Sequence, residues 1–513
     1  MPDVLAAIDQ GTTGSRCFLF DLAGRVVSSA YREHAQIFPA PGWVEHDAVE
    51  IRENVGHVVA DAIAGAPGAR VLAIGVTNQR ETVVAWDQET GRPIHNAIVW
   101  QDTRTEPECR ALIASGIEDR VRARTGLPIR TYFSATKIRW ILAHVSEAAR
   151  LAAAGRLRIG TMDAWVIWNL TGGPEGGAHV TDPTNASRTL LCALETLAWD
   201  PELLDRFGVP GGALPQIRPS IPEEPYGWTS ASGPLRARVP VCGNLGDQQA
   251  ALFGQACFRA GDAKNTYGTG SFLLQHVGGS PVESRHGLLA TAAAAVAGTR
   301  AYALEGSVAV TGSAVQWLRD GLQMIANASE TEPLARSVPD SGGVYFVPAF
   351  SGLFAPHWDM SARGTVVGLT RFATRAHLVR ATLEAIAFQS REVLDAMTAD
   401  GGWTPGALKV DGGATGNDFL MQLQADILGI PVIRPKVKET TALGASQAAG
   451  LAIGAYGSLS DLERLWKSDR VFEPEWSAAR REEAFRGWKR AVERSRGWIE
   501  EKGTDNGQGI TNS

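Results

Sequence analysis

The chain has 513 residues, of which 44% are hydrophobic and 20% charged, and its formal net charge is −6. This length allows about two to four domains, and the composition excludes a largely disordered, coiled-coil or collagen-like chain. With 49 basic against 55 acidic side chains, there is no basic excess to hold nucleic acid. We therefore expect small-molecule partners and no nucleic acid.

Cysteine usage and the apolar segments predict a cytoplasmic protein with no membrane span. The five cysteines are scattered and form no CxxC pair, which argues against a disulfide framework or a zinc site. The opening segment MPDVLAAIDQ has no basic residue before its short apolar run, unlike a signal peptide. The most apolar internal stretch, residues 288–298, is far shorter than the ~20 residues of a membrane helix.

The first half of the chain alternates predicted strands and helices. Residues 4–9 and 17–21 are apolar runs joined by the turn QGTTGSR, which predicts a β-hairpin. Their apolar spacing predicts further strands at 71–77 and 97–100 and helices at 47–64, 104–115 and 134–154. This alternation is typical of an α/β domain.

The second half opens in the same way, after a Pro- and Gly-rich stretch at about 208–240. A strand ending in VPVCG and a helix at 247–257 precede DAKNTYGTGSFLLQHV, again a Gly-Thr turn between strand-like runs. Two such hairpins suggest a duplicated domain with a cleft between the copies. We expect later strands near 344–348 and 407–411, helices near 376–397, 417–428 and 442–452, amphipathic helices over 460–502 and a disordered tail at 503–513.

The segment DQGTTGSR, residues 9–16, carries the strongest chemical signal. Its turn can place backbone N–H groups and two threonine hydroxyls around a phosphate. Asp9 can hold Mg²⁺ through water, and Arg16 can reach the same phosphates from the returning strand. An ordinary hairpin turn favours the same residue types, but YGTG at 267–270 offers a second hydroxyl-bearing loop for the other side of a nucleotide.

Two further segments carry a weaker signal for nucleotide binding. In VDGGATGN, residues 410–417, an apolar strand ends in glycines ahead of a helix. Such glycines let a ligand approach the backbone, and the helix N-terminus can receive a polar group. Gly312 precedes a helix near Gln316 in the same manner. An ordinary strand-to-helix turn that binds no ligand would have the same sequence pattern. No lysine follows a glycine, and GxGxxG, GxSxG and HExxH are missing, which removes several common nucleotide-binding and hydrolase classes.

Charged and amide side chains at two other segment ends suggest a substrate site. Arg80 and Glu81 follow a buried strand, where ligands collect, and can donate to and accept from hydroxyl groups; a surface ion pair is the default interpretation. Asp247 and Gln248 stand at the start of a predicted helix, where an aspartate is by default a cap. Three aromatic residues would by default belong to the core: Trp100, Tyr132 and Phe272.

Taken in order, these segments resemble the glycerol kinase family of carbohydrate kinases, in the actin and sugar-kinase superfamily. The resemblance extends from about residue 4 to about residue 455. The segments that carry it are AAIDQGTTGSR, TNQRETVVAWD, VWQDTRT, YFSATKIRW, GTMDAWVIWNLTGG, TDPTNASRT, GDQQAALFGQ, KNTYGTGSF and VDGGATGNDFLMQLQADILG.

The resemblance implies an α/β fold of two duplicated ribonuclease-H-like (actin-like ATPase) domains around a central cleft. Residues 1–253 would form the N-terminal domain with the glycerol site and phosphate loop, and residues 254–502 the nucleotide-binding C-terminal domain. The implied activity is ATP-dependent phosphorylation of glycerol to sn-glycerol 3-phosphate with Mg-ATP as donor. The family is commonly dimeric or tetrameric, so a homo-oligomer is expected.

The resemblance also assigns roles residue by residue. Glycerol would contact Arg80, Glu81, Tyr132, Asp247 and Gln248, with Trp100 and Phe272 along its carbon chain and Asp247 as general base. The terminal phosphates would contact Thr12, Thr13, Gly14 and Arg16, and the rest of the nucleotide Thr269, Gly312, Gln316, Gly413 and Asn417. Mg²⁺ would lie near Asp9 and Asp247.

Some features depart from the family, and two alternatives stay open. The family often has serine where this chain has Gly14, and its regulatory patterns are not matched near 229–238 and 472–477. One alternative is a kinase of a ketopentose, pentitol or gluconate. The other is a nucleotide-driven conformational protein resembling actin or a heat-shock chaperone, against which Arg80, Glu81 and Tyr132 argue because such a protein needs no polyol pocket.

Overall fold

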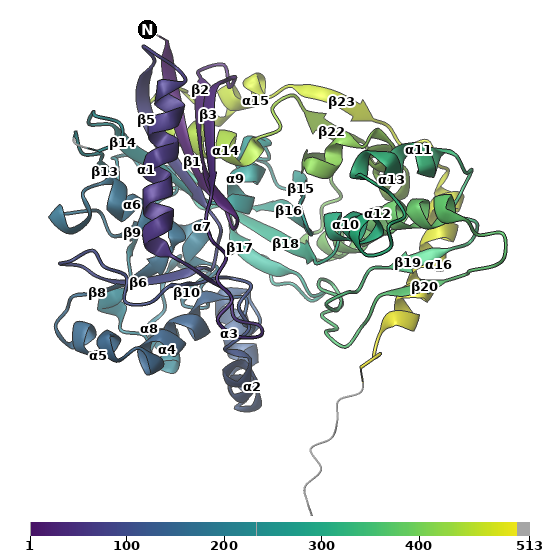
Figure 1. Cartoon of the computed structure of the whole chain (residues 1–513), viewed down its shortest axis with the longest axis horizontal. Helices are drawn as coiled ribbons and strands as arrows, with labels where there is room; N and C mark the ends of the chain where they lie inside the picture. The colour runs from purple at the N-terminus through teal and green to yellow at the C-terminus, as the bar shows by residue number, and fades with distance from the viewer. Residues whose placement is uncertain (1, 232, 500–513) are drawn as a thin grey trace, which may run out of the picture.

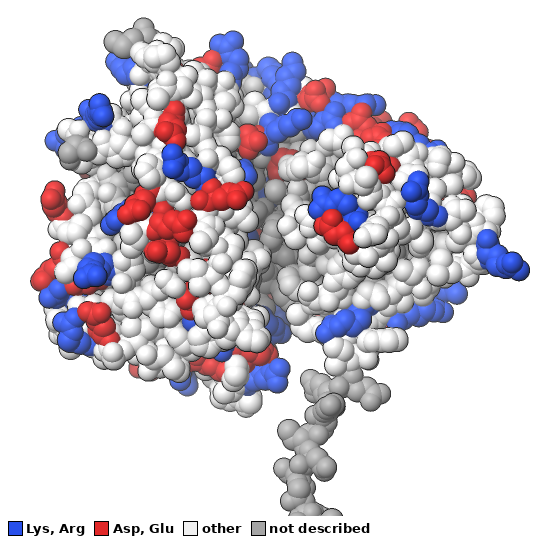
Figure 2. Space-filling model, viewed as in Figure 1, with Lys and Arg blue, Asp and Glu red and all other residues white. Residues whose placement is uncertain are grey.

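The structure is a computed structural model that describes residues 2–231 and 233–499. The tail expected at 503–513 lies outside the described residues. Two bodies, each built on a large mixed sheet, lie side by side (Figure 1), and the surface is hollowed where they meet (Figure 2).

The N-terminal body holds a six-stranded sheet in the order β13–β14–β5–β1–β2–β3. Strand β1 is antiparallel to β2 and parallel to β5, which is parallel to β14. The strands are β1 (Asp3–Gln10), β2 (Gly14–Asp21), β3 (Val26–Glu33), β5 (Arg70–Asn78), β13 (Gly227–Trp228) and β14 (Pro240–Gly246).

The C-terminal body holds a seven-stranded sheet in the order β17–β18–β16–β15–β21–β22–β23. Strand β15 is antiparallel to β16 and parallel to β21, the pattern of β1 with β2 and β5. This repeat matches the expected duplication. The strands are β15 (Ala263–Tyr267), β16 (Ser271–Gly278), β17 (Leu289–Ala292), β18 (Tyr302–Val308), β21 (Leu408–Gly412), β22 (Val432–Pro435) and β23 (Ser468–Phe472).

Helices cover both faces of the N-terminal sheet because alternate residues of β1 point to opposite faces. Val4, Ala6 and Ile8 pack in one core cluster with residues of α1 (Ala48–Ala64) and α6 (Met162–Leu170). Leu5 and Ala7 face the other side, where α14 (Thr440–Ala452) packs together with α9 (Asp247–Gly254). Helix α14 belongs to the C-terminal half of the sequence, so the far end of the chain completes the core of the first body.

Glycines permit this close packing of α14. A Cβ atom at Gly75 or Gly243 would collide with the carbonyl oxygen of Ala445, and one at Gly444 with that of Ala250 on α9. The predicted boundary at residues 253/254 falls at the last residues of α9.

The remaining helices and strands surround the two large sheets. In the N-terminal half they are β4 (Glu45–His46), β6 (Val83–Asp87), β7 (Ala97–Ile98), α2 (Glu106–Ala114), α3 (Glu118–Thr125), α4 (Ser134–His144), α5 (Ser146–Ala153), β8 (Leu157–Thr161), β9 (Val180–Thr181), α7 (Pro183–Ala186), β10 (Cys192–Ala193), β11 (Ala198–Trp199), α8 (Pro201–Phe207) and β12 (Gln216–Ile217). In the C-terminal half they are α10 (Gly312–Asp320), α11 (Thr331–Arg336), β19 (Tyr345–Val347), β20 (Thr365–Val367), α12 (Arg375–Gly401), α13 (Asp418–Leu428), α15 (Leu459–Leu465) and α16 (Ala478–Ser495). Four 3₁₀ turns are η1 (Gly173–Glu175), η2 (Gly211–Ala213), η3 (Ala328–Glu330) and η4 (Gly413–Gly416).

Two helix predictions were wrong in part. The helix expected at 134–154 is two helices, α4 and α5, because Val145 between them adopts extended backbone. The stretch 460–502 holds α15 and α16, but β23 separates them and pairs with β22 at the edge of the sheet. Pairing with a distant strand there overrides the local helical spacing.

Candidate active site

Three parallel strands of the N-terminal sheet end side by side, and each is followed by residues that the sequence singled out. In the sheet register Gln10 of β1 pairs with Asn78 of β5, and Asn78 with Gly246 of β14. The Gly-Thr loop (residues 11–14), the Arg80–Glu81 pair and Asp247 therefore leave one edge of the sheet together. This edge, at the carboxyl ends of the strands, is where open α/β sheets bind ligands.

Glu81 lies in a strained turn directly after β5. Its φ of 62° is in the left-handed region, which is rare for a residue other than glycine, asparagine or aspartate. The hydroxyl of Ser134 donates to the Glu81 carbonyl oxygen at 3.0 Å, and the Thr82 N–H donates to the carbonyl of Arg80 at 2.7 Å. Strain of this kind clusters at functional sites, where the surroundings hold it in place.

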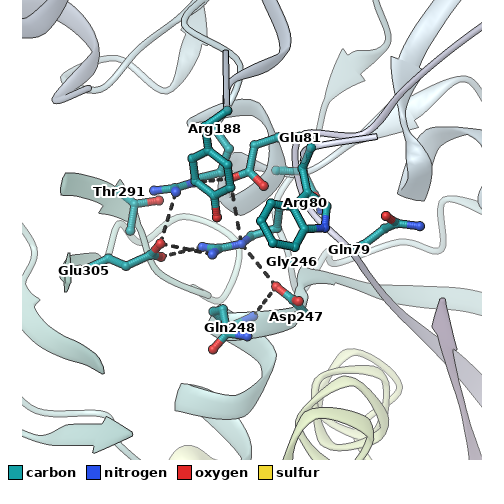
Figure 3. Close-up of polar contacts among 12 residues, drawn as sticks. Gln79, Arg80, Glu81, Arg188, Gly246, Asp247, Gln248, Thr291 and Glu305 are labelled. Carbon is teal, nitrogen blue, oxygen red and sulfur yellow. Dashed lines mark hydrogen bonds and ion pairs between the residues drawn. The ribbon is translucent and has the colours of Figure 1, made fainter. Parts of the chain in front are cut away.

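A buried cluster of four charges forms the floor of the site (Figure 3). Arg80 donates through Nη1 and Nη2 to both carboxylate oxygens of Glu305, at 2.5 and 3.0 Å. Arg188 donates to Glu81 at 2.7 Å and to Glu305 at 3.1 Å. All four side chains are at most 2% exposed. Glu305 comes from β18 of the other body, so the cluster joins the two bodies at the base of the groove.

Burial and the two arginines oppose one another in the titration of the two carboxylates, with opposite outcomes. Burial alone would raise the pKa of Glu305, but Arg188 and Arg80 outweigh it and hold the pKa at about 2. For Glu81 burial prevails over both arginines and raises the pKa. A charged pair sealed in this way loses several kcal/mol if one partner is removed.

Asp247 starts α9 at the open side of this cluster. Its Oδ1 lies 3.1 Å from Arg80 Nε and accepts the N–H of Gln248 at 2.7 Å. About a third of the side chain, 32%, is exposed. Burial raises the pKa of Asp247, while the Arg80 guanidinium opposes that shift. The carboxylate is thus held in place on one side and reachable on the other.

Two of the aromatic side chains expected at the site lie beside the charge cluster. The rings of Trp100 and Tyr132 meet edge to face with centroids 5.5 Å apart, and the guanidinium of Arg188 lies over the Tyr132 ring at 5.7 Å. Phe272 is half-buried and packs against a core cluster, while its backbone carbonyl accepts from the ammonium of Lys264 at 3.3 Å.

The Gly-Thr loop borders the acceptor side directly. The indole Nε1 of Trp100 donates to the hydroxyl oxygen of Thr12 at 2.9 Å. Arg16 on β2 lies 3.9 Å from Asp9 and 3.7 Å from Glu439. Burial raises the pKa of Asp9 to about 6, with Arg16 opposing and Asp247 adding to the rise. The two carboxylates therefore face a common space.

Gly14 is buried, and the structure gives a reason for glycine where the resembling family often has serine. A Cβ atom there would collide with the ring of Tyr31 and with the carbonyl oxygen of Arg32. The Tyr31 ring also carries the Arg16 guanidinium above it at 5.3 Å. The space that a serine side chain needs is taken by β3.

The residues expected on the nucleotide side gather in the other body. Tyr267 of β15 and Gly412 of β21 are register partners, so Thr269 and Gly413 follow adjacent strand ends. The N–H of Gly312, where α10 begins, donates to Gly268 at 3.1 Å. Thr269, Gln316 and Gly413 are exposed. The side chain of Asn417 instead caps α13 by accepting from Leu420 and donates to Thr331 at 3.1 Å.

Sequence reasoning missed three charged residues of the site. Glu305 and Arg188 complete the floor, and Lys264 of β15 donates to Gln248 at 2.5 Å and to Thr266 at 2.7 Å. Burial lowers the pKa of Lys264 to about 8. A charged residue inside an otherwise apolar strand, as in YALEG and DAKNTY, was the available signal, since a buried charge needs a partner.

The comparisons with known proteins all indicate the same family. The N-terminal domain model of the FGGY family of carbohydrate kinases matches residues 4–254, and its C-terminal domain model matches residues 263–453. A glycerol kinase of Saccharopolyspora erythraea is 56% identical over 98% of this chain and 100% of its own length. A glycerol kinase of Mycobacterium tuberculosis is 54% identical over 97% of each chain.

Among solved structures, the glycerol kinase of Plasmodium falciparum with ADP superposes with a TM-score of 0.91 at 38% identity. The match covers 96% of this chain and 98% of that one. The expected α/β fold of two actin-like halves is confirmed by this match. None of the helices within residues 2–231 and 233–499 is both long enough and apolar enough to cross a membrane.

Proposed function

The chain belongs to the FGGY family of carbohydrate kinases, and we propose that it transfers the terminal phosphoryl group of ATP to glycerol, giving sn-glycerol 3-phosphate. The observation that carries the proposal is the identity of 54–56% with glycerol kinases along nearly the whole chain. The site supports it, because its donors and acceptors suit a small polyol.

Glycerol offers three hydroxyl groups, so recognition depends on paired donors and acceptors. Arg80 has its Nη groups on Glu305 and turns its Nε edge to Asp247. In our proposal this edge and Glu81 hold two hydroxyl groups, helped by Tyr132 and Gln248. Trp100 and Phe272 cover the carbon chain. A site that hydrogen-bonds a substrate hydroxyl rejects an analogue without it by as much as ~10⁴–10⁵-fold.

Asp247 is the proposed general base. It is the exposed carboxylate beside Arg80, and it takes the proton of the attacking hydroxyl as the bond to phosphorus forms. The transition state of phosphoryl transfer is loose, so a carboxylate serves this role without a strongly basic pKa. Gln248, held by Lys264, assists by fixing the start of α9.

The donor side is assigned to the two Gly-Thr elements. Thr12, Thr13 and the N–H of Gly14, together with Arg16, hold the terminal phosphates, and most of the barrier reduction comes from this positioning and charge. The remainder of the nucleotide lies on Thr269, Gly312, Gln316, Gly413 and Asn417.

The residues present also fit a magnesium ion. Burial mainly raises the pKa of Asp9, and the Asp247 carboxylate adds to the rise, so the two carboxylates lie close enough to interact. Within the described residues no group of three or more His, Cys, Asp or Glu side chains is placed to hold a metal. Mg²⁺ is commonly held by one or two carboxylates plus substrate phosphates, so Asp9 and Asp247 would hold it, and it would neutralise charge on the phosphates.

The test is ADP release with Mg-ATP in the presence of glycerol, xylulose, ribulose, gluconate or no acceptor. We expect strong stimulation by glycerol alone. Stimulation by another of these compounds would refute the glycerol assignment and keep the phosphate loops. Turnover independent of any acceptor would indicate a conformational ATPase.

We also propose a cytoplasmic location and a homo-oligomer of two or four subunits. The five cysteines are buried and free, which suits a reducing compartment, and the family resemblance favours the oligomer. Sedimentation of the purified chain tests the assembly, and a monomer at micromolar concentration would contradict it.

A further inference from the structure

The acceptor wall and the Gly-Thr loop are joined by a closed circuit of hydrogen bonds. Trp100 donates two of its hydrogen bonds. Its indole N–H donates to the Thr12 hydroxyl oxygen at 2.9 Å, and its backbone N–H donates to the hydroxyl oxygen of Thr82 at 3.2 Å. Thr82 in turn donates to Oε1 of Gln79 at 2.9 Å.

From Gln79 the circuit returns to Thr12 through two more side chains, His46 and Gln36. Gln79 Nε2 lies 3.4 Å from His46 Nδ1, and His46 Nε2 lies 2.9 Å from Gln36 Oε1. Gln36 Nε2 then donates to the carbonyl oxygen of Thr12 at 3.0 Å. Gln79 Nε2 also donates to the carbonyl of Gly11 at 3.2 Å. Side chain and backbone of the loop are thus both tied to Trp100.

Chemistry fixes the direction of most bonds in the circuit. An indole nitrogen can only donate, and a hydroxyl group has one hydrogen. The amides of Gln36 and Gln79 donate through Nε2 to loop carbonyls, so their oxygens must accept, and His46 must donate through Nε2 to Gln36. Gln79 Nε2 also donates to Gln10 Oε1 at 3.0 Å, so its 3.4 Å contact with His46 Nδ1 is the weakest part of the circuit. His46 is fully buried, and burial, with His34 beside it, lowers its pKa to about 3, so the neutral form prevails at neutral pH.

This arrangement decides what the Thr12 hydroxyl can do. Because its oxygen accepts the indole N–H, its single hydrogen remains available to donate elsewhere. A phosphate is an anion and takes only donors in this setting. The loop would therefore present a hydroxyl oriented for a phosphate before the nucleotide arrives.

We propose that Trp100 is a positioning residue of the phosphate loop as well as a wall of the acceptor pocket. Its indole N–H orients the Thr12 hydroxyl, and the ring that contacts the acceptor is the same ring that holds the loop. The proposal rests on the proposed function, since it assigns phosphate to the Gly-Thr loop and the acceptor to the face of Trp100.

The test separates the ring from its N–H. Trp100→Phe keeps an aromatic wall and removes the donor, and Thr12→Val removes the hydroxyl. We expect each to raise KM for ATP or lower kcat, by about 3- to 10-fold, while KM for the acceptor changes less than about 2-fold. Thr12→Ser, which keeps the hydroxyl, should restore most of the loss.

Coupling is measured with the double variant Trp100→Phe/Thr12→Val. Because both changes break one interaction, the double variant should be about as impaired as the worse single variant. Trp199→Phe is the matched control: it removes an indole N–H bonded to the Pro215 carbonyl at 2.8 Å, away from the site, and should leave both KM values unchanged.

The outcomes distinguish this proposal from the proposed function. Wild-type turnover with each acceptor is measured first, and no turnover with glycerol would refute the function. Affinity for Mg-ATP without acceptor, by titration calorimetry, then tests the positioning role alone. If Trp100→Phe binds Mg-ATP like the wild type and raises only the acceptor KM, or if its effect multiplies with that of Thr12→Val, the positioning role is refuted.

Discussion

Asp247 and its neighbour Arg80 set the chemistry at the scale of single residues. The carboxylate is anchored on one oxygen by Arg80 Nε and the Gln248 N–H, while about a third of its side chain is open. An anchored and accessible carboxylate suits proton transfer, because the base must be in place before the hydroxyl attacks.

Replacing Asp247 by Asn should lower kcat by at least ~10²-fold, as expected for the loss of a general base. The amide keeps the size and one acceptor oxygen, so the melting temperature should change little, while affinity for Mg-ATP should fall because Asp247 is also a proposed ligand of Mg²⁺. Steady-state kinetics measure kcat, and calorimetry measures nucleotide affinity and the melting temperature. Asp200→Asn is the control, since Asp200 caps α8 and pairs with Arg124 far from the site, and it should spare kcat. Activity within about threefold of wild type for Asp247→Asn would rule out the base assignment.

Asp9 gives a stability prediction with a definite sign. Its pKa in the folded chain is about 6, above the ordinary aspartate value of 3.8, chiefly because the carboxyl is buried. A raised carboxyl pKa favours the folded state while the group is protonated, and this contribution is lost as pH rises through about 6. Asp9→Asn, which cannot ionise, should therefore melt higher than wild type at pH 7.5 and equally near pH 4. Calorimetric melting at both pH values checks this, and a lower melting point at pH 7.5 would contradict it.

At the scale of elements, the two Gly-Thr hairpins and the strand-end motifs were predictable because their signals are local. The Gly-Thr turns QGTTGSR and YGTG, with apolar runs beside them, predicted β1–β2 and β15–β16. The same holds for Arg80 and Asp247, which directly follow strands. Glu305 gave only the weak signal of a charge within an apolar strand. Its pairing with Arg188 and Arg80 was not predictable, because β18 and the segment after α7 reach the site from distant parts of the chain. Strand β17 and the edge strand β23 also carry no local signal of their own.

The crossing of α9 and α14 makes a prediction at this scale. Gly444 faces the backbone of Ala250 so closely that any Cβ atom would collide with it. Gly444→Val should destabilise the protein by about 1–3 kcal/mol or more, as overpacking does, and reduce the yield of folded chain. Gly56→Ala, where a Cβ atom meets open space on α1, is the control and should leave the melting temperature nearly unchanged. Equal melting temperatures for Gly444→Val and wild type would show that the helices can separate without cost.

At the scale of the whole molecule, the buried charge cluster holds the two bodies together at the base of the groove. Arg80 and Arg188 come from the N-terminal half, and Glu305 from the C-terminal sheet. Pulling β18 away from Arg80 and Arg188 would leave these buried charges unpaired, so the cluster opposes separation of the two bodies.

Glu305→Gln should cost about 3–5 kcal/mol at neutral pH, because two buried arginines lose their shared partner. The pKa of Glu305, about 2 in the folded chain, lies below the ordinary glutamate value of 4.5, so its contribution to stability is present above about pH 4.5 and fades as pH falls towards 2. The loss of stability of Glu305→Gln relative to wild type should therefore shrink as pH falls from about 4.5 towards 2. Since Arg80 loses its orientation, KM for glycerol should also rise. The control is Glu384→Gln, which breaks the buried pair with Arg380 elsewhere in the C-terminal body. It should lower stability without changing the KM for glycerol. If both variants raised that KM equally, the proposed link between Glu305 and the orientation of Arg80 would be wrong.

The position of α14 in the chain has a consequence for synthesis on the ribosome. The sheet of the first body is complete when β14 ends at Gly246, yet the helix that covers one of its faces begins at Thr440. At roughly 5–20 residues per second, the nascent sheet waits on the order of 10–40 seconds with that apolar face uncovered. The first half therefore cannot finish folding as it emerges, and the growing chain presents a binding surface for chaperones until almost all of it has been translated.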